Sequence, residues 1–398
     1  MTRVLVRHAS ALPDPVLLAR CRKSPELGPK ILFFSGGTAL RGLSRELVSF
    51  THNSIHLITP FDSGGSSAVL RKAFRMPAVG DIRNRLMALA DRSLHGNPEI
   101  VALFAHRLPK DGDQDETGRE LARMARGRHP LVAGVPDPMR KIIRTYLFEF
   151  LERVPADFDL RGASIGNLVL AAGYLANRRH LDPIIHLFSM LVRVLGVVRP
   201  VVNKDLHLAA KLADGTVLAG QHRLSGKEAP PVASPIERIW LTKSPDSADP
   251  VEAPPARDKL KKLIREADLI CYPMGSFYSS LLACLLPRGI SEAIAANPCP
   301  KVFVPNAGRD PELLGHDLGL EIERLLAVLT ADDPTRLKPE QVLNSILIDR
   351  RRLAREPGLD RKGLALRGLS LIPCELISAQ SAPLIDDTLL ARVLVSLA

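Results

Sequence analysis

The sequence predicts an α/β fold: a doubly wound, mostly parallel, Rossmann-like sheet with an antiparallel hairpin annex and a helical insertion. Residues 31–34 form a continuous apolar run that stops at a glycine turn and is followed by leucines at helical spacing. A strand buried on both faces has this pattern. Strand and helix patterns alternate again from residue 257, which indicates parallel pairing. Asp214-Gly215 separates two alternating runs and predicts a hairpin.

The chain is expected to divide into three segments. Residues 1–29 are an extension, residues 30–330 form a nucleotide-binding core, and residues 331–398 form a C-terminal α/β segment that completes the core. Residues 107–137 are polar and rich in glycine and aspartate, and are interpreted as an insertion or lid. Residues 197–242 are interpreted as the antiparallel annex, because the hydrophobic period changes from helical to two where they begin.

The remaining elements follow from the same periodicities. A second strand is expected at residues 55–59, and Gly80-Asp81 opens a helix for which Asp81 is a suitable N-cap. Further helices are expected at residues 138–153, 164–177, 182–195, 257–266, 277–286, 291–296, 312–329 and 386–397. Further strands are expected at residues 236–241, 269–272, 301–305, 346–349 and 369–376.

The composition excludes several classes of function. With 54 basic and 43 acidic residues, the 398-residue chain has a formal net charge of +11, which favours anionic partners without choosing among them. Only 4% of the residues are aromatic, so nucleic acid is not an expected partner. No apolar run is long enough for a membrane span, and no secretory signal is expected. The five cysteines are scattered and fit a reducing cytoplasm.

Chemistry is expected at the turns that follow the predicted strands. In an open α/β sheet, ligands bind beyond the carboxyl ends of the strands, and glycine lets the backbone approach a phosphate closely. The turns of this form are Gly36-Gly37-Thr38, Gly64-Gly65-Ser66-Ser67, and Gly275-Ser276 with Asn306 in the next loop. All of them also fit plain strand-to-helix turns. Neither G-x-G-x-x-G nor G-x-x-x-x-G-K-[ST] occurs, which disfavours dinucleotide oxidoreductases and P-loop kinases.

Charged residues beside these turns supply the catalytic candidates. Asp62 and Asp81 are the nearest carboxylates, and either fits a Mg²⁺ ligand beside a phosphate or a general base. N-capping alone also accounts for Asp81. Arg71, Arg83 and Arg85 fit phosphate clamps, and each also fits a surface arginine. The eleven histidines show no metal-binding spacing and are interpreted as structural.

Taken together, the motifs resemble the CofD-like superfamily of 2-phospho-L-lactate transferases, and within it the YvcK-type gluconeogenesis factors. The matching motifs occur in family order over residues 30–330: S-G-G-T-A-L from Ser35, D-S-G-G-S-S from Asp62, G-D-I-R-N from Gly80, S-I-G-N-L from Ser164, Asp214-Gly215-Thr216, A-D-L-I from Ala267, G-S-F-Y-S-S from Gly275, and Asn306.

The resemblance implies a nucleotide diphosphate conjugate or a sugar nucleotide as the ligand, with Mg²⁺ as a cofactor that Asp62 would hold. It carries over Thr38, Asn167 and Tyr278 as ligand contacts, with Tyr278 stacking on a base or sugar. The expected catalytic residues are Asp62 and Arg83. The expected ligand contacts are Gly36, Gly37, Thr38, Gly64, Gly65, Ser66, Ser67, Arg71, Asp81, Asn84, Gly166, Asn167, Gly275, Ser276, Tyr278 and Asn306.

The sequence departs from the family pattern at several of these motifs. Ser63 replaces the second aspartate of a D-D pair, which weakens a two-carboxylate metal site, and Ala68-Val69 replaces Gly-Arg, which removes a phosphate-clamping arginine. Ala39 and Met274 replace glycines. These departures indicate a divergent subgroup, for which the CofD-like proteins found beside ATP-grasp and kinase-like genes (GAK systems) are a candidate.

Two functions remain open from the sequence. One is an enzyme that binds a nucleotide diphosphate conjugate and transfers its phospho-linked group to an acceptor. The other is a non-catalytic, sugar-nucleotide-binding regulator that signals through a protein partner, which Ser63 and the missing arginine favour. Under both hypotheses the expected partner is a nucleotide-type small molecule, no membrane partner is expected, and the family's tendency to dimerise makes a homodimer an expectation.

Overall fold

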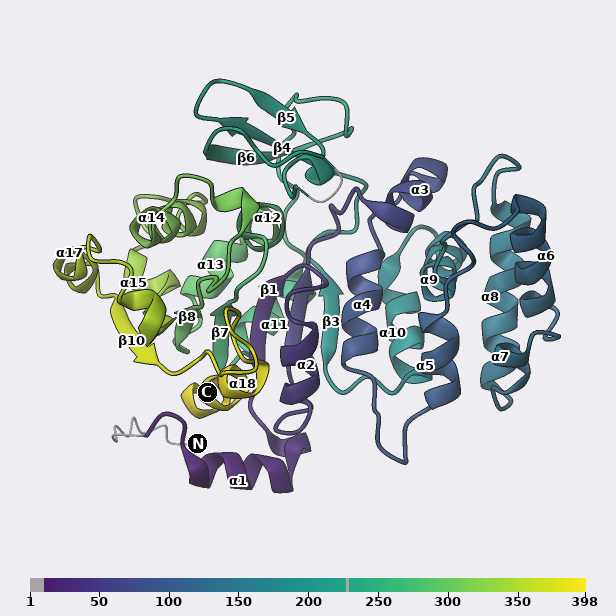
Figure 1. Ribbon diagram of the computed structural model, residues 1–398, viewed down its shortest axis with the longest axis horizontal. Helices are drawn as coiled ribbons and strands as arrows, with labels where there is room; N and C mark the ends of the chain where they lie inside the picture. Colours follow the sequence, from purple (N-terminus) through teal and green to yellow (C-terminus); the bar gives the residue numbers. More distant parts are fainter. Residues whose placement is uncertain (1–10, 227–228) are drawn as a thin grey trace.

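A seven-stranded parallel sheet forms the centre of the structure. The structure is a computed structural model, and it describes residues 11–226 and 229–398. The strand order is β10-β9-β8-β7-β1-β2-β3, and helices cover both faces (Figure 1). A second sheet has three antiparallel strands in the order β5-β4-β6. The predicted fold class is therefore confirmed. No helix among the described residues has the length and apolar character needed to cross a bilayer.

The elements have the following bounds. The main sheet contains β1 (Ile31–Ser35), β2 (Ile55–Ile58), β3 (Val197–Pro200), β7 (Leu269–Tyr272), β8 (Lys301–Phe303), β9 (Ser345–Asp349) and β10 (Ser370–Cys374), and the small sheet contains β4 (His207–Leu212), β5 (Val217–Ala219) and β6 (Ile236–Thr242). The α-helices are α1 (Pro15–Lys23), α2 (Arg41–Leu47), α3 (Gly65–Phe74), α4 (Gly80–Ala88), α5 (Pro98–Ala105), α6 (Gln114–Ala125), α7 (Pro130–Ala133), α8 (Met139–Arg153), α9 (Ile165–Ala176), α10 (Leu181–Leu191), α11 (Asp258–Arg265), α12 (Ala283–Leu285), α13 (Ile290–Ala295), α14 (Leu318–Leu329), α15 (Pro339–Val342), α16 (Arg350–Leu353), α17 (Arg361–Leu366) and α18 (Asp387–Leu397). Short 3₁₀ turns are η1 (Pro25–Leu27), η2 (Gln221–Arg223) and η4 (Pro311–Leu313), and η3 (Phe277–Leu282) is a π-helix.

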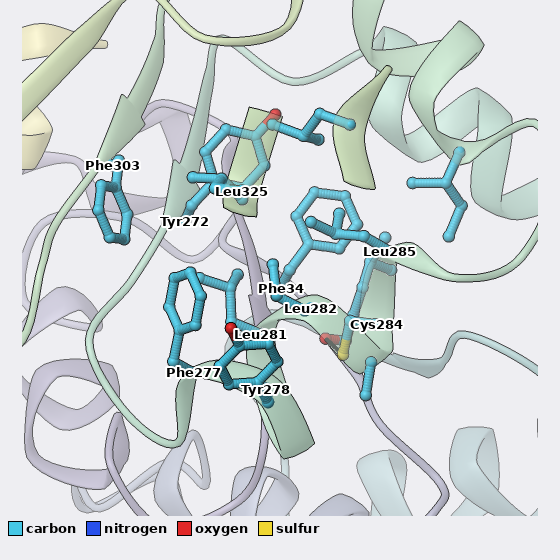
Figure 2. Close-up of a cluster of buried hydrophobic side chains, with 14 of the residues drawn as sticks. Phe34, Tyr272, Phe277, Tyr278, Leu281, Leu282, Cys284, Leu285, Phe303 and Leu325 are labelled. Atoms are coloured by element: carbon cyan, nitrogen blue, oxygen red, sulfur yellow. Dashed lines mark hydrogen bonds between the residues drawn. The ribbon is translucent and has the colours of Figure 1, made fainter. Parts of the chain in front are cut away.

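The two faces of the main sheet bury separate hydrophobic clusters. In β1, Ile31 and Phe33 belong to a cluster with α1, α2 and α18, whereas Leu32 and Phe34 belong to one with α11, α13 and α14. All four side chains are fully buried. Phe34 stacks on Tyr272 of β7, with ring centroids 5.9 Å apart, in the cluster that Figure 2 shows. Burial on both faces explains why β1 is a continuous apolar run.

Helices α5 to α10 form a helical lobe beyond the β3 edge of the sheet (Figure 1). The predicted insertion at residues 107–137 contains α6 and α7, which pack against α8 and α5. In α6, Leu121 and Met124 are fully buried in the lobe's hydrophobic cluster. The insertion therefore extends this lobe, and of its residues only Arg107 lines the large cleft described below.

Several predicted boundaries differ from the structure. Residues 197–200 were expected in the antiparallel annex, but they form β3, which pairs in parallel with β2. β3 is an edge strand and is buried on one face only, so its pattern alternates like that of an antiparallel strand. The β4–β5 hairpin at Gly215 is confirmed. The helix expected at residues 312–329 begins only at Leu318, after a glycine with φ of +72°.

The N-terminal extension lies partly within the described residues. Helix α1 packs against α18 and buries Leu18 and Cys21, so residues 11–29 contribute to the core. Residues 1–10 lie outside the described residues, and so does the expectation about a secretory signal.

Candidate ligand-binding cleft

A cleft of about 470 Å³ opens where the strand order of the main sheet reverses. The chain runs outward from β1 to β2 and β3, returns to β7 on the other side of β1, and then runs outward to β10. The loops after β1 and β7 therefore diverge here, which is where open α/β sheets bind ligands. The loops that follow β1, β2, β7 and β8 line the cleft, together with the start of α4 and with η2, which follows β5 of the small sheet.

Most of the predicted site residues lie in the lining of this cleft. They are Gly36, Gly37, Thr38, Asp62, Gly64, Gly65, Ser66, Ser67, Asp81, Arg83, Asn84, Asn167, Gly275, Ser276 and Asn306. The structure thus brings together residues that are up to 270 positions apart in the chain (306 − 36). Their contacts with a ligand stay predictions. Arg71, Gly166 and Tyr278 are not in the lining.

The turn after β1 passes so close to α4 that it requires glycine. A methyl group on Gly37 would lie 2.3 Å from Asp81 Oδ1 and 2.7 Å from Asp81 Cα. A methyl group on Gly36 would lie 2.6 Å from Ser280 Oγ. Because the atoms near Gly37 include backbone, a side-chain rotation cannot relieve that clash. The turn therefore presents its backbone to the cleft.

Arg85 of α4 fixes this turn in place. Its side chain is fully buried, and its guanidinium donates to Leu40 O at 2.7 Å, to Gly36 O at 2.9 Å and to the hydroxyls of Ser44 and Ser35. Burial lowers the pKa of Arg85 to about 10, so the group stays charged at neutral pH. Arg85 is therefore neither a surface arginine nor a phosphate clamp, because it is fully buried and both of its terminal nitrogens donate to the backbone and hydroxyls beneath the turn.

The structure corrects the expectation that Asp81 caps α4. The cap position is Val79, and no side chain caps the helix; Asp81 is the second helical residue and lines the cleft. Its carboxylate lies against Gly36 and Gly37. The N-cap lies two residues earlier than expected, and the first helical residue is Gly80, where a methyl group would lie 2.4 Å from Ser67 Oγ. Ser67 of α3 therefore packs against the start of α4, a contact that the sequence pattern does not reveal.

Asp62 lies in the loop that leads from β2 into α3. Its Oδ1 accepts the Gly64 N–H at 3.1 Å, and Ser67 Oγ accepts the Gly80 N–H at 3.1 Å. A methyl group on Gly80 would lie 3.6 Å from Asp62 Oδ2, so Asp62 lies near the start of α4, which carries Asp81. Carboxylate oxygens suit Mg²⁺, which commonly takes one or two of them and fills its shell with phosphate and water. Asp62 and Asp81 supply carboxylates to the lining, and their binding of Mg²⁺ stays a prediction.

Arg83, Asn167 and Ser66 form a hydrogen-bonded chain along one side of the cleft. Arg83 Nε donates to Asn167 Oδ1 at 3.3 Å, and Asn167 Nδ2 donates to Ser66 Oγ at 2.9 Å. Burial, together with repulsion from Arg107 and Arg41, lowers the pKa of Arg83 to about 10, so Arg83 is a poorly hydrated cation at neutral pH. A cation of this kind in a cleft wall favours an anionic ligand.

The loops after β7 and β8 are joined by a reciprocal amide contact. Asn306 Oδ1 accepts the Gly275 N–H at 2.8 Å, and Asn306 Nδ2 donates to Gly275 O at 2.7 Å. Gly275 has a φ of +133°, which L side chains rarely adopt. This contact gives Gly275 and Asn306 a structural role at the end of the sheet. It also holds Gly275 and Ser276 at the cleft.

Two carboxylates hold the start of the π-helix η3 behind these loops. Asp310 Oδ2 accepts the Phe277 N–H at 2.9 Å, and Glu312 Oε2 accepts the N–H groups of Tyr278 and Ser279, each at 2.8 Å. Glu312 is fully buried. Burial, reinforced by repulsion from Asp310, raises the pKa of Glu312 to about 7. The expected helix at residues 277–286 is thus present but begins with π geometry.

The structure also corrects the prediction that Arg71 contacts the ligand. Arg71 is 4% exposed, and its guanidinium donates to Asp205 Oδ1 at 2.8 Å and to the carbonyls of Phe61, Asp62 and Leu206. These contacts tie the loop after β2 to the segment that leads into β4. Its donors are therefore directed to the protein and not to the cleft.

Tyr278 and Gly166 are likewise placed away from the lining. Tyr278 is 1% exposed, and its hydroxyl donates to Ile236 O at 2.8 Å; Figure 2 shows its ring inside the hydrophobic cluster. The predicted stacking of Tyr278 on a base or sugar does not agree with this position. A methyl group on Gly166 would lie 3.1 Å from Arg83 Cγ, so Gly166 leaves room for Arg83 without facing the cleft.

Several polar residues of the lining were missed by the sequence analysis. They are Arg107, Gln221, His222, Ser225, Arg309 and Asp310. His222 Nδ1 lies 3.0 Å from Ser63 Oγ, and the His222 N–H donates to the same oxygen at 3.0 Å. The two residues are 159 positions apart, so no local spacing signals the pair. The replacement of an expected aspartate by Ser63 was the only available signal.

Comparison with known proteins identifies the family. A family model described as 2-phospho-L-lactate transferase CofD matches residues 31–357, a span that includes every loop of the cleft. The chain belongs to the CofD family. The resemblance inferred from the ordered motifs is thereby confirmed, and the CofD-type segment begins at the first residue of β1 and extends beyond β9.

Relatives of this CofD-family chain carry the name of the gluconeogenesis factors. The gluconeogenesis factor of Bacillus subtilis is 28% identical over 372 residues, which cover 90% of this chain and 95% of the relative. The putative gluconeogenesis factor of Thermoanaerobacterium thermosulfurigenes is 31% identical over 304 residues, which cover 75% and 74% of the two chains. A crystal structure of a UPF0052 family protein from Bacillus halodurans superposes with a TM-score of 0.65 at 23% identity, covering 92% of this chain and 98% of the other. It has the same fold.

Proposed function

We propose that this CofD-family chain binds a nucleotide diphosphate conjugate in the strand-end cleft and transfers its phospho-linked group to an acceptor. The observation that carries the proposal is the convergence of two backbone turns and a buried cation on one cleft: the Gly36–Thr38 turn, the start of α3, and Arg83. Backbone N–H groups and guanidinium groups are the partners that phosphate oxygens take in proteins.

The proposed role of each residue follows from its position in the lining of the cleft. The diphosphate lies against the turn after β1 and the start of α3, and Arg83 offsets the negative charge that grows on the leaving phosphate. Asp62 would hold Mg²⁺, and that ion would neutralise part of the diphosphate charge. The loops with Ser276 and Asn306 lie on the opposite side of the cleft, where the rest of the conjugate fits.

The proposed transfer exchanges one phosphorus–oxygen bond for another. The oxygen of an acceptor hydroxyl forms a bond to the phosphorus of the transferred group, and the bond from that phosphorus to the bridging oxygen breaks. The nucleoside monophosphate leaves with the bridging oxygen. The hydroxyl proton passes to the carboxylate of Asp81, the other acidic residue beside the glycine turn.

Calorimetry with GDP, GTP and UDP-sugars, each with and without Mg²⁺, tests the binding step. The proposal predicts saturable binding of one nucleotide per chain for at least one of these compounds. Phosphorus NMR of the bound conjugate then tests turnover, which Asp62→Asn should abolish while binding persists. Failure of every nucleotide to bind would sink the proposal.

The second candidate function is a non-catalytic regulator that binds a sugar nucleotide. The observation that favours it is the length of the match to proteins named gluconeogenesis factors, which reaches 95% of the Bacillus subtilis relative. Ser63 and Val69, which stand where the family has an aspartate and an arginine, also favour it. Under this function a UDP-sugar binds without turnover, and ligand changes the affinity for a protein partner or for a second copy of the chain. Turnover that depends on Asp62 would exclude it.

A further inference from the structure

A second cluster of functional side chains lies outside the cleft, in the helical lobe. His106 follows the last residue of α5, Glu120 is in α6, and His129 immediately precedes α7. One nitrogen of each histidine and one oxygen of the glutamate lie within 4.8 Å of one another. Within residues 11–226 and 229–398, no other three histidine, cysteine or acidic groups are gathered this closely.

We propose that His106, Glu120 and His129 bind a divalent transition-metal ion of the zinc type. Glu120 Oε1 lies 2.9 Å from His106 Nε2 and 3.7 Å from His129 Nε2. With metal–ligand bonds of about 2.0–2.1 Å, ligand atoms in a tetrahedral site are about 3.3 Å apart. These two separations bracket that value, and the nitrogens of the two histidines lie within 4.8 Å of each other. Side-chain movements would therefore bring both nitrogens and the oxygen into range of one ion.

The backbone places the three ligands before any ion binds. The His106 N–H donates to Ala102 O at 3.1 Å, and its carbonyl accepts the Ile165 N–H at 3.0 Å, which anchors this residue to both α5 and α9. Glu120 lies in the 12-residue helix α6. The side chains of Glu120 and His129 are 14% and 15% exposed, and that of His106 is 29% exposed. The site is therefore partly enclosed and open to solvent at His106.

The chemistry of the ligands selects the class of ion. Two imidazoles with one carboxylate suit Zn²⁺, Co²⁺ or Fe²⁺, whereas Mg²⁺ and Ca²⁺ prefer oxygen ligands throughout. Three protein ligands leave a fourth position for water or a small molecule, as in catalytic zinc sites. His106 immediately precedes Arg107, which lines the ligand-binding cleft and donates to Gly162 O at 3.0 Å.

Two features of the cluster oppose the binding of an ion and limit the affinity of the site. His129 Nδ1 accepts the Leu131 N–H at 3.3 Å, so in the neutral ring Nε2 carries the proton and donates toward Glu120. An ion at Nε2 moves that proton to Nδ1, and the long contact with Leu131 must open. Arg123 is also nearby, and its positive charge opposes the ion. Burial is the largest cause of a lowered pKa of His129; the charge of Glu120 acts against it, and the charges of His106 and Arg123 act with it.

The test uses the untagged full chain after treatment with a chelator. Titration with Co²⁺ should produce the visible absorption bands of a four-coordinate ion, and Zn²⁺ should abolish them. Elemental analysis should give one Zn²⁺ per chain, with a Kd of about 1 µM or tighter. Absence of stoichiometric binding at about 100 µM Zn²⁺ would overturn the proposal and leave the three side chains as a hydrogen-bonded cluster.

Matched variants locate the ion. Glu120→Gln and His129→Asn should each weaken Zn²⁺ binding at least about 100-fold, while circular dichroism confirms that the variants remain folded. His186→Asn changes an exposed histidine of α10 in the same lobe and should bind Zn²⁺ like the wild type. Stoichiometric binding that survives both Glu120→Gln and His129→Asn would show that the ion is held elsewhere and would equally overturn the proposal.

Discussion

The two walls of the strand-end cleft are held in place by opposite charges. The β1–β2 wall, formed by the loops after these strands, rests on buried arginines: Arg85 donates to the carbonyls of Gly36 and Leu40, and Arg71 donates to those of Phe61, Asp62 and Leu206. The β7–β8 wall rests on carboxylates: Asp310 and Glu312 accept the first N–H groups of η3 from Phe277, Tyr278 and Ser279.

This difference separates anchoring from ligand contact on each wall. On the β1–β2 wall the anchors are cations that stay charged at neutral pH, and Arg83 alone among the three candidate phosphate clamps lines the cleft. On the β7–β8 wall the buried anchor Glu312 has a pKa raised to about 7 by burial and by Asp310. Substitutions should therefore distinguish anchoring residues from ligand contacts on the β1–β2 wall. A change of pH should alter the stability of the β7–β8 wall.

The largest effect is expected at the glycine turn of the β1–β2 wall. Gly37→Val places a side chain against the Asp81 backbone, 2.7 Å from Cα to the first added carbon, so the turn must move away from the cleft. We expect nucleotide affinity, measured by calorimetry, to fall at least about 100-fold, or about 2.7 kcal/mol.

The matched control for Gly37→Val is Gly118→Ala in helix α6. A methyl group there meets open space, and alanine favours a helix over glycine by about 0.8–1.0 kcal/mol. This variant should bind nucleotide normally and unfold at a higher temperature. Wild-type affinity in Gly37→Val would show that the turn does not form the phosphate site.

The next largest effect separates two arginines of α4. Arg85→Leu leaves buried carbonyl and hydroxyl groups without donors and should destabilise the protein by about 3 kcal/mol in urea unfolding. Arg83→Leu should cost much less stability, because Arg83 faces the cleft, but should weaken nucleotide binding by about 10–100-fold. The reverse pattern, with Arg83→Leu unfolding more readily than Arg85→Leu, would contradict the assignment of anchor and ligand contact.

A smaller effect is expected on the β7–β8 wall when the pH changes. The pKa of Glu312 is raised from 4.5 to about 7, chiefly by burial, so the folded state holds a proton that the unfolded state has lost. Its stabilising contribution is complete below pH 4.5 and disappears as the pH rises through about 7. The free energy of unfolding should therefore fall between pH 5 and pH 8 by about 1–3 kcal/mol more in the wild type than in Glu312→Gln. Identical pH profiles would show that Glu312 does not titrate in this window.

The smallest effect is expected for the hydrogen-bonded pair of Ser63 and His222 at the edge of the cleft. Ser63→Ala removes the hydroxyl that holds the His222 ring at 3.0 Å but leaves the buried anchors intact. We expect nucleotide affinity to fall about fivefold, or about 1 kcal/mol, with little change in the melting temperature. A large loss of stability with unchanged affinity would make the pair a structural contact only.

Local patterns were sufficient to predict the fold and the place of the cleft. The two-sided apolar run of β1 and the Asp-Gly hairpin depend on near neighbours in sequence, and the glycine turns lie at strand ends whatever the details of packing. The roles of individual charged residues depend on distant partners instead. Arg85 and Arg71 fit phosphate clamps in the sequence, because nothing there shows the backbone carbonyls that accept hydrogen bonds from their guanidinium groups. The residues of the His106–Glu120–His129 cluster come from three separate helical segments without a regular spacing.

A crystal structure of the chain with bound GDP or a UDP-sugar would show directly whether the strand-end cleft holds the nucleotide. We expect the diphosphate to lie within hydrogen-bond distance of the Gly37 and Thr38 N–H groups and of the Arg83 guanidinium, between the two walls of the cleft. A nucleotide bound elsewhere, such as over Arg351 and Arg355 in the smaller pocket beside α16, with the strand-end cleft empty, would contradict it.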